Sequence, residues 1–198
     1  MTNEAVRHTA GGRSRTQDRL RFLRRLRAIR HFLPQSVPQE AIDDILEVAR
    51  WSGSASNRQP WEFLVVRDQP TLQALGAIKG ATAGHLARAP LGIFLIMSGD
   101  PARAIHEAYD DGRLSERIML AAQAYGLGSC IGWFTGDAST EAKRMLGVPQ
   151  EKLMRTVIAI GYPDRAAHEV ARQERRARQG TAGARRPLSQ LVHEERYK

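Results

Sequence analysis

The chain has 198 residues, of which 42% are hydrophobic, and this is enough for one domain with a buried core. Its longest apolar run, residues 91–97, is far below the roughly 20 residues of a membrane span, and residues 1–15 lack the apolar segment of a signal peptide. The single cysteine, Cys130, excludes an intramolecular disulfide. We therefore expect a cytoplasmic protein that does not contact a membrane.

The net charge of +9 is concentrated at the two ends of the chain. Residues 1–30 carry nine arginines against two acidic residues, and residues 164–198 carry nine basic against five acidic residues. A DNA-binding domain more often spreads its charge along a recognition element, and the sequence has no helix-turn-helix, RNP or zinc-finger pattern. We expect solvated termini and no nucleic-acid partner, with arginines that serve an anionic cofactor as the second interpretation.

The first third of the chain is predicted to hold an irregular arm and two helices. The polar, arginine-rich residues 1–16 are assigned to a disordered arm. Apolar residues recur at helical spacing across residues 18–29, and this helix is predicted to run on to Phe32. A second helix is predicted to open at Pro38, with an apolar face formed by Ile42, Ile45, Leu46 and Ala49.

Strands and helices alternate through the rest of the chain. Apolar runs predict four strands, at residues 61–66, 91–97, 129–135 and 153–160. Helices are predicted after Pro70, over residues 103–125 and over residues 137–147. The tail from Asp164 is predicted to be irregular as far as Pro187. The alternation indicates one α+β domain over residues 17–198, in which a sheet is sandwiched between helices (α/β/α).

Three segments carry polar side chains that suit a ligand, although each is a weak signal alone. The loop from Ser54 to Trp61 offers hydroxyls and amides, but spacing alone favours an ordinary surface loop. Arg27 and Arg30 are one helical turn apart, so two guanidiniums, which suit phosphate, could face one point. The pair Arg185-Arg186 near the C-terminus is a second signal of the same kind.

Five segments in a fixed order resemble the FMN-dependent nitroreductase family. They are Arg-x-x-Arg-x-Phe from Arg27, Ser-x-x-Asn-x-Gln-Pro-Trp from Ser54, Gly-Leu-Gly-Ser-Cys-Ile-Gly-Trp-Phe from Gly126, Ile-Gly-Tyr-Pro from Ile160 and Arg-Arg-Pro-Leu from Arg185. The resemblance covers residues 24–195. It implies a mostly antiparallel central sheet, two FMN per homodimer, and a C-terminal extension that wraps the partner.

The resemblance also implies which residues hold the phosphate and ribityl chain of FMN. Arg27 and Arg30 are expected to do so, with Ala28 contributing backbone. This sequence departs from the family pattern at Leu26, Ala28 and Gly183, where relatives often have Arg, Ser and Lys. The phosphate site is therefore depleted, and Arg185, with Arg186 beside it, is expected to carry more of the phosphate's charge.

The resemblance also implies that two further segments contact the flavin. Asn57 and Gln59, with Ser54 and Ala55 close by, match the loop that reaches FMN from the partner subunit, although Gly53 stands where a proline is common. Gly132 and Trp133 match the stretch whose backbone N–H groups face flavin N5 in relatives. Such a donor would stabilise the negative charge that develops on reduction.

The predicted activity is a ping-pong transfer of two electrons from NADH or NADPH, through FMN, to a nitroaromatic or quinone acceptor. No side chain is assigned as a catalytic acid or base and no metal is expected, because flavin N5 carries the chemistry. The histidines, His85 among them, have no carboxylate at a telling spacing. Two alternatives stay open: a specialised relative such as a flavin-consuming dimethylbenzimidazole synthase or a deiodinase, and a non-catalytic basic binding protein.

Overall fold

The computed structural model describes residues 10–179 and 185–197. The chain divides into two compact units, Met1–Asp164 and Arg165–Lys198. The first unit contains the whole sheet and every candidate residue except the two C-terminal arginines.

The sheet has four strands, all paired antiparallel, in the order β1-β2-β4-β3. Their bounds are Trp61–Val66 for β1, Leu91–Met97 for β2, Gly128–Trp133 for β3 and Leu153–Gly161 for β4. The predictions for β1 and β2 are confirmed residue for residue, and β3 ends two residues earlier than expected. β1 and β3 are the two edges of the sheet, and this position decides which candidate residues can meet.

Five α-helices belong to the same unit. They are α1 (Ala10–Arg25), α2 (Gln39–Arg50), α3 (Gln69–Gly76), α4 (Ala104–Ala124) and α5 (Asp137–Leu146), together with the short 3-10 helices η1 (Ala55–Asn57), η2 (Gly84–Arg88) and η3 (Pro101–Arg103). The helix α2 begins at Gln39, one residue after the predicted opening at Pro38, and Gly147 ends α5 in the left-handed conformation, with φ of 68°.

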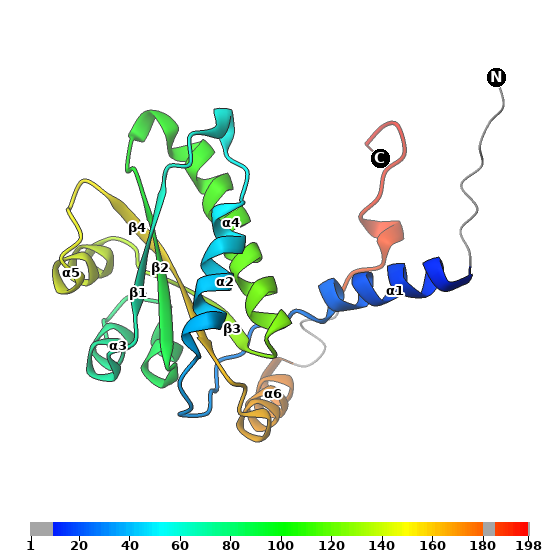
Figure 1. The fold of residues 1–198 in the computed structure, drawn as a ribbon, viewed down its shortest axis with the longest axis horizontal. Coiled ribbons are helices and arrows are strands. Elements are labelled where there is room, and N and C mark those ends of the chain that lie inside the picture. The colour runs from blue at the N-terminus through cyan, green and yellow to red at the C-terminus, as the bar shows by residue number, and fades with distance from the viewer. Residues whose placement is uncertain (1–9, 180–184, 198) are drawn as a thin grey trace. The chain divides into compact units, whose positions relative to one another are not determined.

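Helices cover both faces of the sheet, and the alternation of β2 shows why (Figure 1). All seven residues of β2 are buried, because side chains alternate between two cores. Leu91, Ile93 and Leu95 pack with α2 and α4, whereas Phe94 and Ile96 pack with α3, η2 and α5. This arrangement confirms the predicted α/β/α sandwich with a central antiparallel sheet.

The N-terminal helix differs from the prediction at both ends. Residues 10–16, which the sequence assigns to the arm, are helical, and the rest of the arm lies outside the described residues. The helix ends at Arg25 rather than continuing to Phe32. Beyond it the backbone is extended, because Ile29 donates its N–H to the Ser129 carbonyl at 2.8 Å and Phe32 forms a bridge with Pro163.

The second unit also contains a helix where an irregular tail was predicted. This helix, α6, spans Arg165–Gln179 and is followed by the 3-10 helix η4 (Leu188–Gln190). The prediction was wrong because it gave more weight to the high charge of the segment than to its spacing: Ala166, Ala167, Val170 and Ala171 recur three and four residues apart and form a narrow apolar stripe. Its alanines, arginines and glutamines are strong helix formers, and Arg172 pairs with Glu169 at 2.8 Å.

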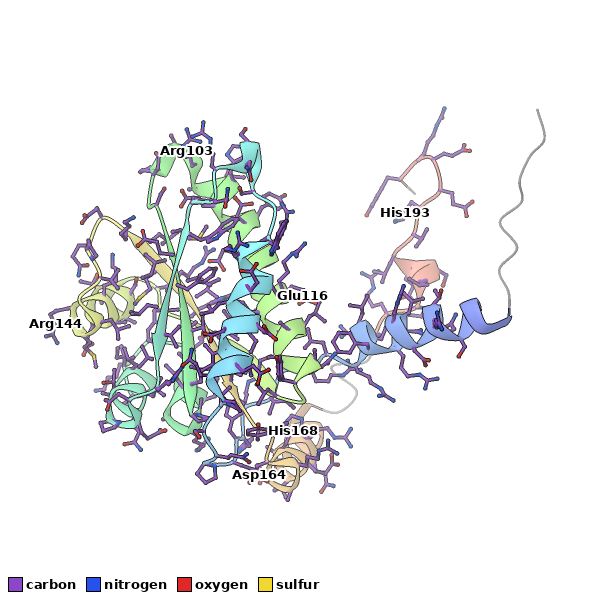
Figure 2. The ribbon with its side chains drawn as sticks, in the orientation of Figure 1. Arg103, Glu116, Arg144, Asp164, His168 and His193 are labelled. Atoms are coloured by element: carbon purple, nitrogen blue, oxygen red, sulfur yellow. The ribbon has the colours of Figure 1, made fainter. Side chains whose placement is uncertain are left out.

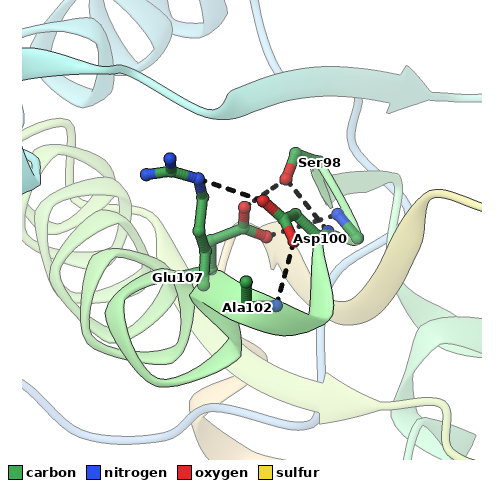
Figure 3. Close-up of polar contacts among 6 residues, drawn as sticks. Ser98, Asp100, Ala102 and Glu107 are labelled. Carbon is green, nitrogen blue, oxygen red and sulfur yellow. Dashed lines mark hydrogen bonds and ion pairs between the residues drawn. The ribbon is translucent and has the colours of Figure 1, made fainter.

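A polar network fixes the start of α4 (Figure 3). The buried Glu107 carboxylate accepts hydrogen bonds from the Ser98 hydroxyl and, at 3.4 Å, from the Gly99 N–H. Asp100 accepts from the Ala102 N–H at 2.9 Å and pairs with Arg103 at 3.0 Å. These contacts satisfy the backbone N–H groups of the β2–α4 turn, so we assign the acidic residues a structural role.

Among the described residues, no helix is long and apolar enough to cross a membrane.

Candidate active site

The extended segment after α1 lies along the outer edge of β3. Ala28 and Ser129 form a parallel bridge, so this segment adds a short length of backbone to the edge strand. Gly128 permits this approach, because a Cβ on it would lie 2.8 Å from the Cβ of Ile29. Two predicted segments far apart in sequence, residues 27–30 and 126–134, are therefore neighbours in the fold.

The two arginines of this segment do not act as a pair on one helix face. In an extended backbone, residues three apart point to opposite sides. The Arg27 guanidinium turns back and donates to the Arg24 and Leu26 carbonyls at 2.7 Å each, so it caps the end of α1. The expectation that both face one point from a helix was therefore wrong. Arg30 is half-buried and, among the described residues, has no hydrogen-bond or ion-pair partner.

Along β3, the backbone N–H and C=O groups of successive residues point alternately toward β4 and toward the open edge of the sheet. Phe134 donates its N–H to Arg155 of β4, whereas the carbonyls of Ser129 and Trp133 accept from Ile29 and from Thr82. Odd-numbered residues of β3 therefore direct their N–H and C=O groups outward, and even-numbered residues direct theirs to β4. On this edge the outward N–H groups between the two flanking contacts belong to Ile131 and Trp133.

This alternation refines the prediction for Gly132. Its N–H points to β4, so the candidate backbone donors are Ile131 and Trp133. No acceptor within residues 10–179 or 185–197 reaches the outward N–H of Ile131. Gly132 matters for another reason: a Cβ there would lie 2.9 Å from the Cβ of Ala83 and 3.1 Å from Cε1 of His85.

The loop before β2 closes over the same stretch of β3, and sequence reasoning missed it. Thr82 donates its N–H to the Trp133 carbonyl at 2.9 Å, and Nε2 of His85 lies 3.3 Å from the Cys130 carbonyl. His85 is only 8% exposed, and burial lowers its pKa while the charge of Arg30 lowers it further. The hydrogen bond to Cys130 opposes this shift. No local motif could have indicated His85, since its contacts lie 45 or more residues away.

The loop from Ser54 to Gln59 lies at the other edge of the sheet. It leads into β1, so within one chain it is three strand spacings, roughly 14 Å, from β3. The loop is tightly folded: Ser56, Asn57 and Gln59 have positive φ values of 54°, 54° and 50°, and the Ser54 hydroxyl accepts from the Gln59 N–H at 2.9 Å. A non-glycine residue at positive φ is uncommon, and three together mark a specialised loop.

Gly53 and Ala55 show how this loop packs and which part of it is exposed. A Cβ on Gly53 would lie 2.3 Å from a terminal nitrogen of Arg113, so glycine leaves room for that guanidinium on α4. Ala55 opens η1 and is exposed. The side chains of Asn57 and Gln59 are exposed and contact each other at 3.3 Å. In one chain, the loop presents its amides to the surface rather than to β3.

The remaining predicted residues, Arg185 and Arg186, belong to the second unit. Both are exposed, and Arg186 donates to the Gln190 carbonyl at 2.8 Å. Gly183 lies outside the described residues. Among those described, no group of three or more His, Cys, Asp or Glu side chains is arranged to hold a metal ion.

An apolar surface lies beside the specialised loop. Trp51 at the end of α2 and Ile105 and Tyr109 on α4 are 68%, 74% and 74% exposed. A depression of about 510 Å³ on α4 is lined by Ala108, Tyr109, Gly112, Arg113, Glu116 and Arg117; Figure 2 shows the outward position of Glu116. Exposed aromatic and aliphatic side chains of this kind mark interaction surfaces.

Comparison with known proteins decides the family. The profile of the nitroreductase family matches residues 23–80 and 69–162, which together make up more than half of the chain. The chain belongs to the nitroreductase family. The predicted resemblance is confirmed, and with it the prediction that the protein is an oxidoreductase enzyme.

Relatives of this nitroreductase span most of its length. A protein of Archaeoglobus fulgidus named NADH dehydrogenase/NAD(P)H nitroreductase is 31% identical, over 73% of this chain and 84% of its own. The NADH dehydrogenase of Thermus thermophilus is 27% identical, over 84% and 90% of the two chains. The solved structure of an FMN-dependent nitroreductase from Clostridium difficile is 26% identical, with a TM-score of 0.68 and coverage of 89% and 98%.

Proposed function

We propose that this nitroreductase binds FMN along the open edge of β3 and passes two electrons from NADH or NADPH to a nitroaromatic or quinone acceptor. The observation that carries the proposal is the outward N–H of Ile131, which has no acceptor among the described residues and lies on the same edge as Arg30, whose side chain likewise has no partner among them. The relatives' names, which mention NADH, NAD(P)H and FMN, agree with this assignment. We further propose that the protein works in the cytoplasm.

The residues at the edge fit the chemistry of a flavin. FMN supplies a ring that takes up a hydride at N5 and a phosphate that carries negative charge. The Ile131 N–H can donate to the ring, and Trp133 and Gly132 continue the same strand. Arg30 offers a cation without an acidic partner among the described residues, and Arg27 and the backbone of Ala28 flank it. By the family pattern, Arg185, together with Arg186, is proposed to contribute charge to the phosphate site.

We also propose that each site is built from two copies of the chain. Ser54, Ala55, Asn57 and Gln59 lie at the β1 edge, and one chain cannot bring them to the β3 edge of its own sheet. A homodimer removes this difficulty, because the loop of one subunit can reach the β3 edge of its partner. The exposed apolar side chains beside the loop, Trp51, Ile105 and Tyr109, give such a dimer a surface to bury. The C-terminal extension is proposed to wrap the partner.

The decisive experiment measures cofactor uptake and then kinetics. The purified protein is expected to be yellow, or to retain the flavin absorbance after added FMN is removed by gel filtration, and to oxidise NADH or NADPH only when FMN is present. Initial rates with a quinone are expected to give parallel double-reciprocal lines, as a ping-pong mechanism requires. A protein that takes up no FMN would contradict the proposal, whereas intersecting lines would contradict only the ping-pong sequence. Mass spectrometry of products from reduced FMN and oxygen tests the dimethylbenzimidazole alternative.

A further inference from the structure

His85 is a buried histidine that the proposed function does not use. It lies in η2, on the face of the sheet where Ala83 and Leu86 pack, and its side chain contacts β3 from that face. Two contacts define its position: Nε2 lies 3.3 Å from the Cys130 carbonyl, and Cε1 occupies space that a side chain on residue 132 would need. A carbonyl can only accept, so Nε2 is the protonated nitrogen of the ring.

The Cys130 carbonyl and the Ile131 N–H belong to the same peptide group. A trans peptide is planar, and its C=O and N–H point in opposite directions. The Cys130 carbonyl also faces Ala159 of β4, so His85 supplies a second donor to it. The other end of the same peptide group is the outward N–H of Ile131, which has no acceptor among the described residues. Hydrogen bonds in such a chain polarise one another, by about 10–30% per bond in condensed phases.

The surroundings of His85 keep the ring neutral. Burial lowers the pKa of His85, the bond to Cys130 opposes this shift, and Arg30 lowers the pKa further. The other titratable groups on the elements around it are Arg88 on η2, which is exposed, and the buried Cys130 thiol on β3. A neutral ring with Nε2 protonated is thus the form that contacts Cys130 near pH 7.

We propose that His85 is a positioning residue that fixes and polarises the Cys130–Ile131 peptide, and so strengthens the donor offered to flavin N5. The inference rests on the proposed function, because it assigns a role to the same β3 edge. It differs from a packing role in one respect. Packing requires only the volume of the ring, whereas positioning requires an N–H at the place of Nε2.

The test uses two variants that differ by one methylene group. The amide nitrogen of His85→Gln can occupy the place of Nε2, whereas that of His85→Asn is too short to reach the Cys130 carbonyl. The exposed His106 on α4 provides a control, His106→Asn. In ¹⁵N-labelled protein without cofactor, the Ile131 amide proton is expected to move upfield in His85→Asn and to stay near its wild-type position in His85→Gln and His106→Asn.

The FMN-loaded protein provides the second measurement. His85→Asn is expected to shift the flavin midpoint potential to more negative values and to slow flavin reduction by NADH about three- to tenfold, well below the roughly 100- to 1,000-fold of deleting an oxyanion-hole donor. His85→Gln is expected to restore both. An Ile131 resonance that does not move in His85→Asn, or that moves equally in His85→Gln, would overturn the inference. A wild-type protein without FMN would instead overturn the proposed function, and the Ile131 resonance would still decide the link between His85 and the peptide.

Discussion

Ile29 donates its N–H to the Ser129 carbonyl at 2.8 Å, and this single backbone bond sets the segment after α1 against the edge of β3. The bond brings Arg30 to the strand that carries Ile131, although the two residues are a hundred positions apart in sequence. The candidate site therefore depends on backbone pairing at the sheet edge rather than on a helix face.

Arg30→Ala is expected to weaken FMN binding by about 1.5–3 kcal/mol, the range for a hydrogen bond to a charged group. Arg30 is half-buried and has no acidic partner among the described residues, so the loss reflects the cofactor rather than a broken ion pair. Titration of FMN by fluorescence quenching gives the dissociation constant. Arg144 lies on α5 (Figure 2), and Arg144→Ala serves as the control with unchanged affinity. Equal affinities in the two variants would remove Arg30 from the site.

Arg185→Ala is expected to weaken FMN binding by a similar amount, about 1.5–3 kcal/mol. The proposed phosphate site lacks the side chains that relatives often have at the positions of Leu26, Ala28 and Gly183, so Arg185 is expected to carry more of the charge. Arg186 already donates to the Gln190 carbonyl, and Arg186→Ala is therefore expected to have the smaller effect. The same FMN titration compares both variants, and an unchanged dissociation constant in Arg185→Ala would refute its role.

Gly132→Ala is expected to destabilise the protein by about 1–3 kcal/mol, the cost of overpacking a tight contact. The added methyl would lie 2.9 Å from the Cβ of Ala83 and 3.0 Å from its Cα, so the loop that covers β3 must move. Urea unfolding gives the free energy of unfolding. Gly112 is a helical control: apart from the backbone of its own helix, nothing lies within 4 Å of an added Cβ, and Gly112→Ala is expected to leave stability unchanged or raised. If Gly132→Ala were as stable as wild type, the loop that contains Ala83 would be able to move away from β3 without an energetic cost.

The sequence alone was sufficient to predict the strands of the sheet. It was not sufficient to predict the backbone contacts at the β3 edge, where the candidate site lies. Residues 91–97 form an apolar run, which is typical of a strand that is buried on both faces. The first and last residues of β2 could therefore be predicted from the sequence alone. The helical spacing of Leu20, Leu23, Leu26 and Ile29, in contrast, continued past the true end of α1. The long-range bond from Ile29 to Ser129 overrode that local preference, and no local pattern encodes it.

The same distinction explains the other differences. The segment of α6 has strong helix formers and a narrow stripe of small apolar residues, but its high charge led to the prediction of an irregular tail. His85 became a candidate only when the fold placed it against Cys130, 45 positions away. Gly132 was assigned as a backbone donor from a family pattern, whereas the strand alternation shows that Ile131 and Trp133 direct their N–H groups outward.

A mixture of two variants with weakened sites, assayed at an FMN concentration that loads neither variant alone, is expected to regain activity if each site uses two subunits. Arg30→Ala damages the β3 edge, and the double variant Asn57→Ala, Gln59→Ala damages the loop. Random pairing makes half of the dimers mixed, and each mixed dimer has one intact site, so about a quarter of the wild-type sites return. NADH oxidation is measured after the variants are unfolded and refolded together. Refolding each variant alone is the control, and activity no higher than the average of the two would mean that loop and edge act within one chain.

The stability of the protein is expected to fall below pH 6.5 in part because of His85. The folded pKa of His85 lies below its ordinary value of 6.5, since burial and Arg30 disfavour the charged ring. Above pH 6.5 the ring is neutral in both the folded and unfolded states. Below it the unfolded chain binds the proton first, and the free energy of unfolding falls, by at most about 1.4 kcal/mol per pH unit, until the pH reaches the folded pKa.

The comparison of wild type with His85→Gln isolates this effect. Other groups, such as Asp111, whose pKa is raised by burial, titrate equally in both proteins and cancel in the difference. Urea unfolding between pH 5 and pH 8 gives the difference in free energy of unfolding between wild type and His85→Gln. As the pH falls below 6.5, wild type is expected to lose stability relative to His85→Gln. A difference that is constant across this range would mean that His85 titrates alike in the folded and unfolded chains, and the neutral ring assigned to it would then be wrong.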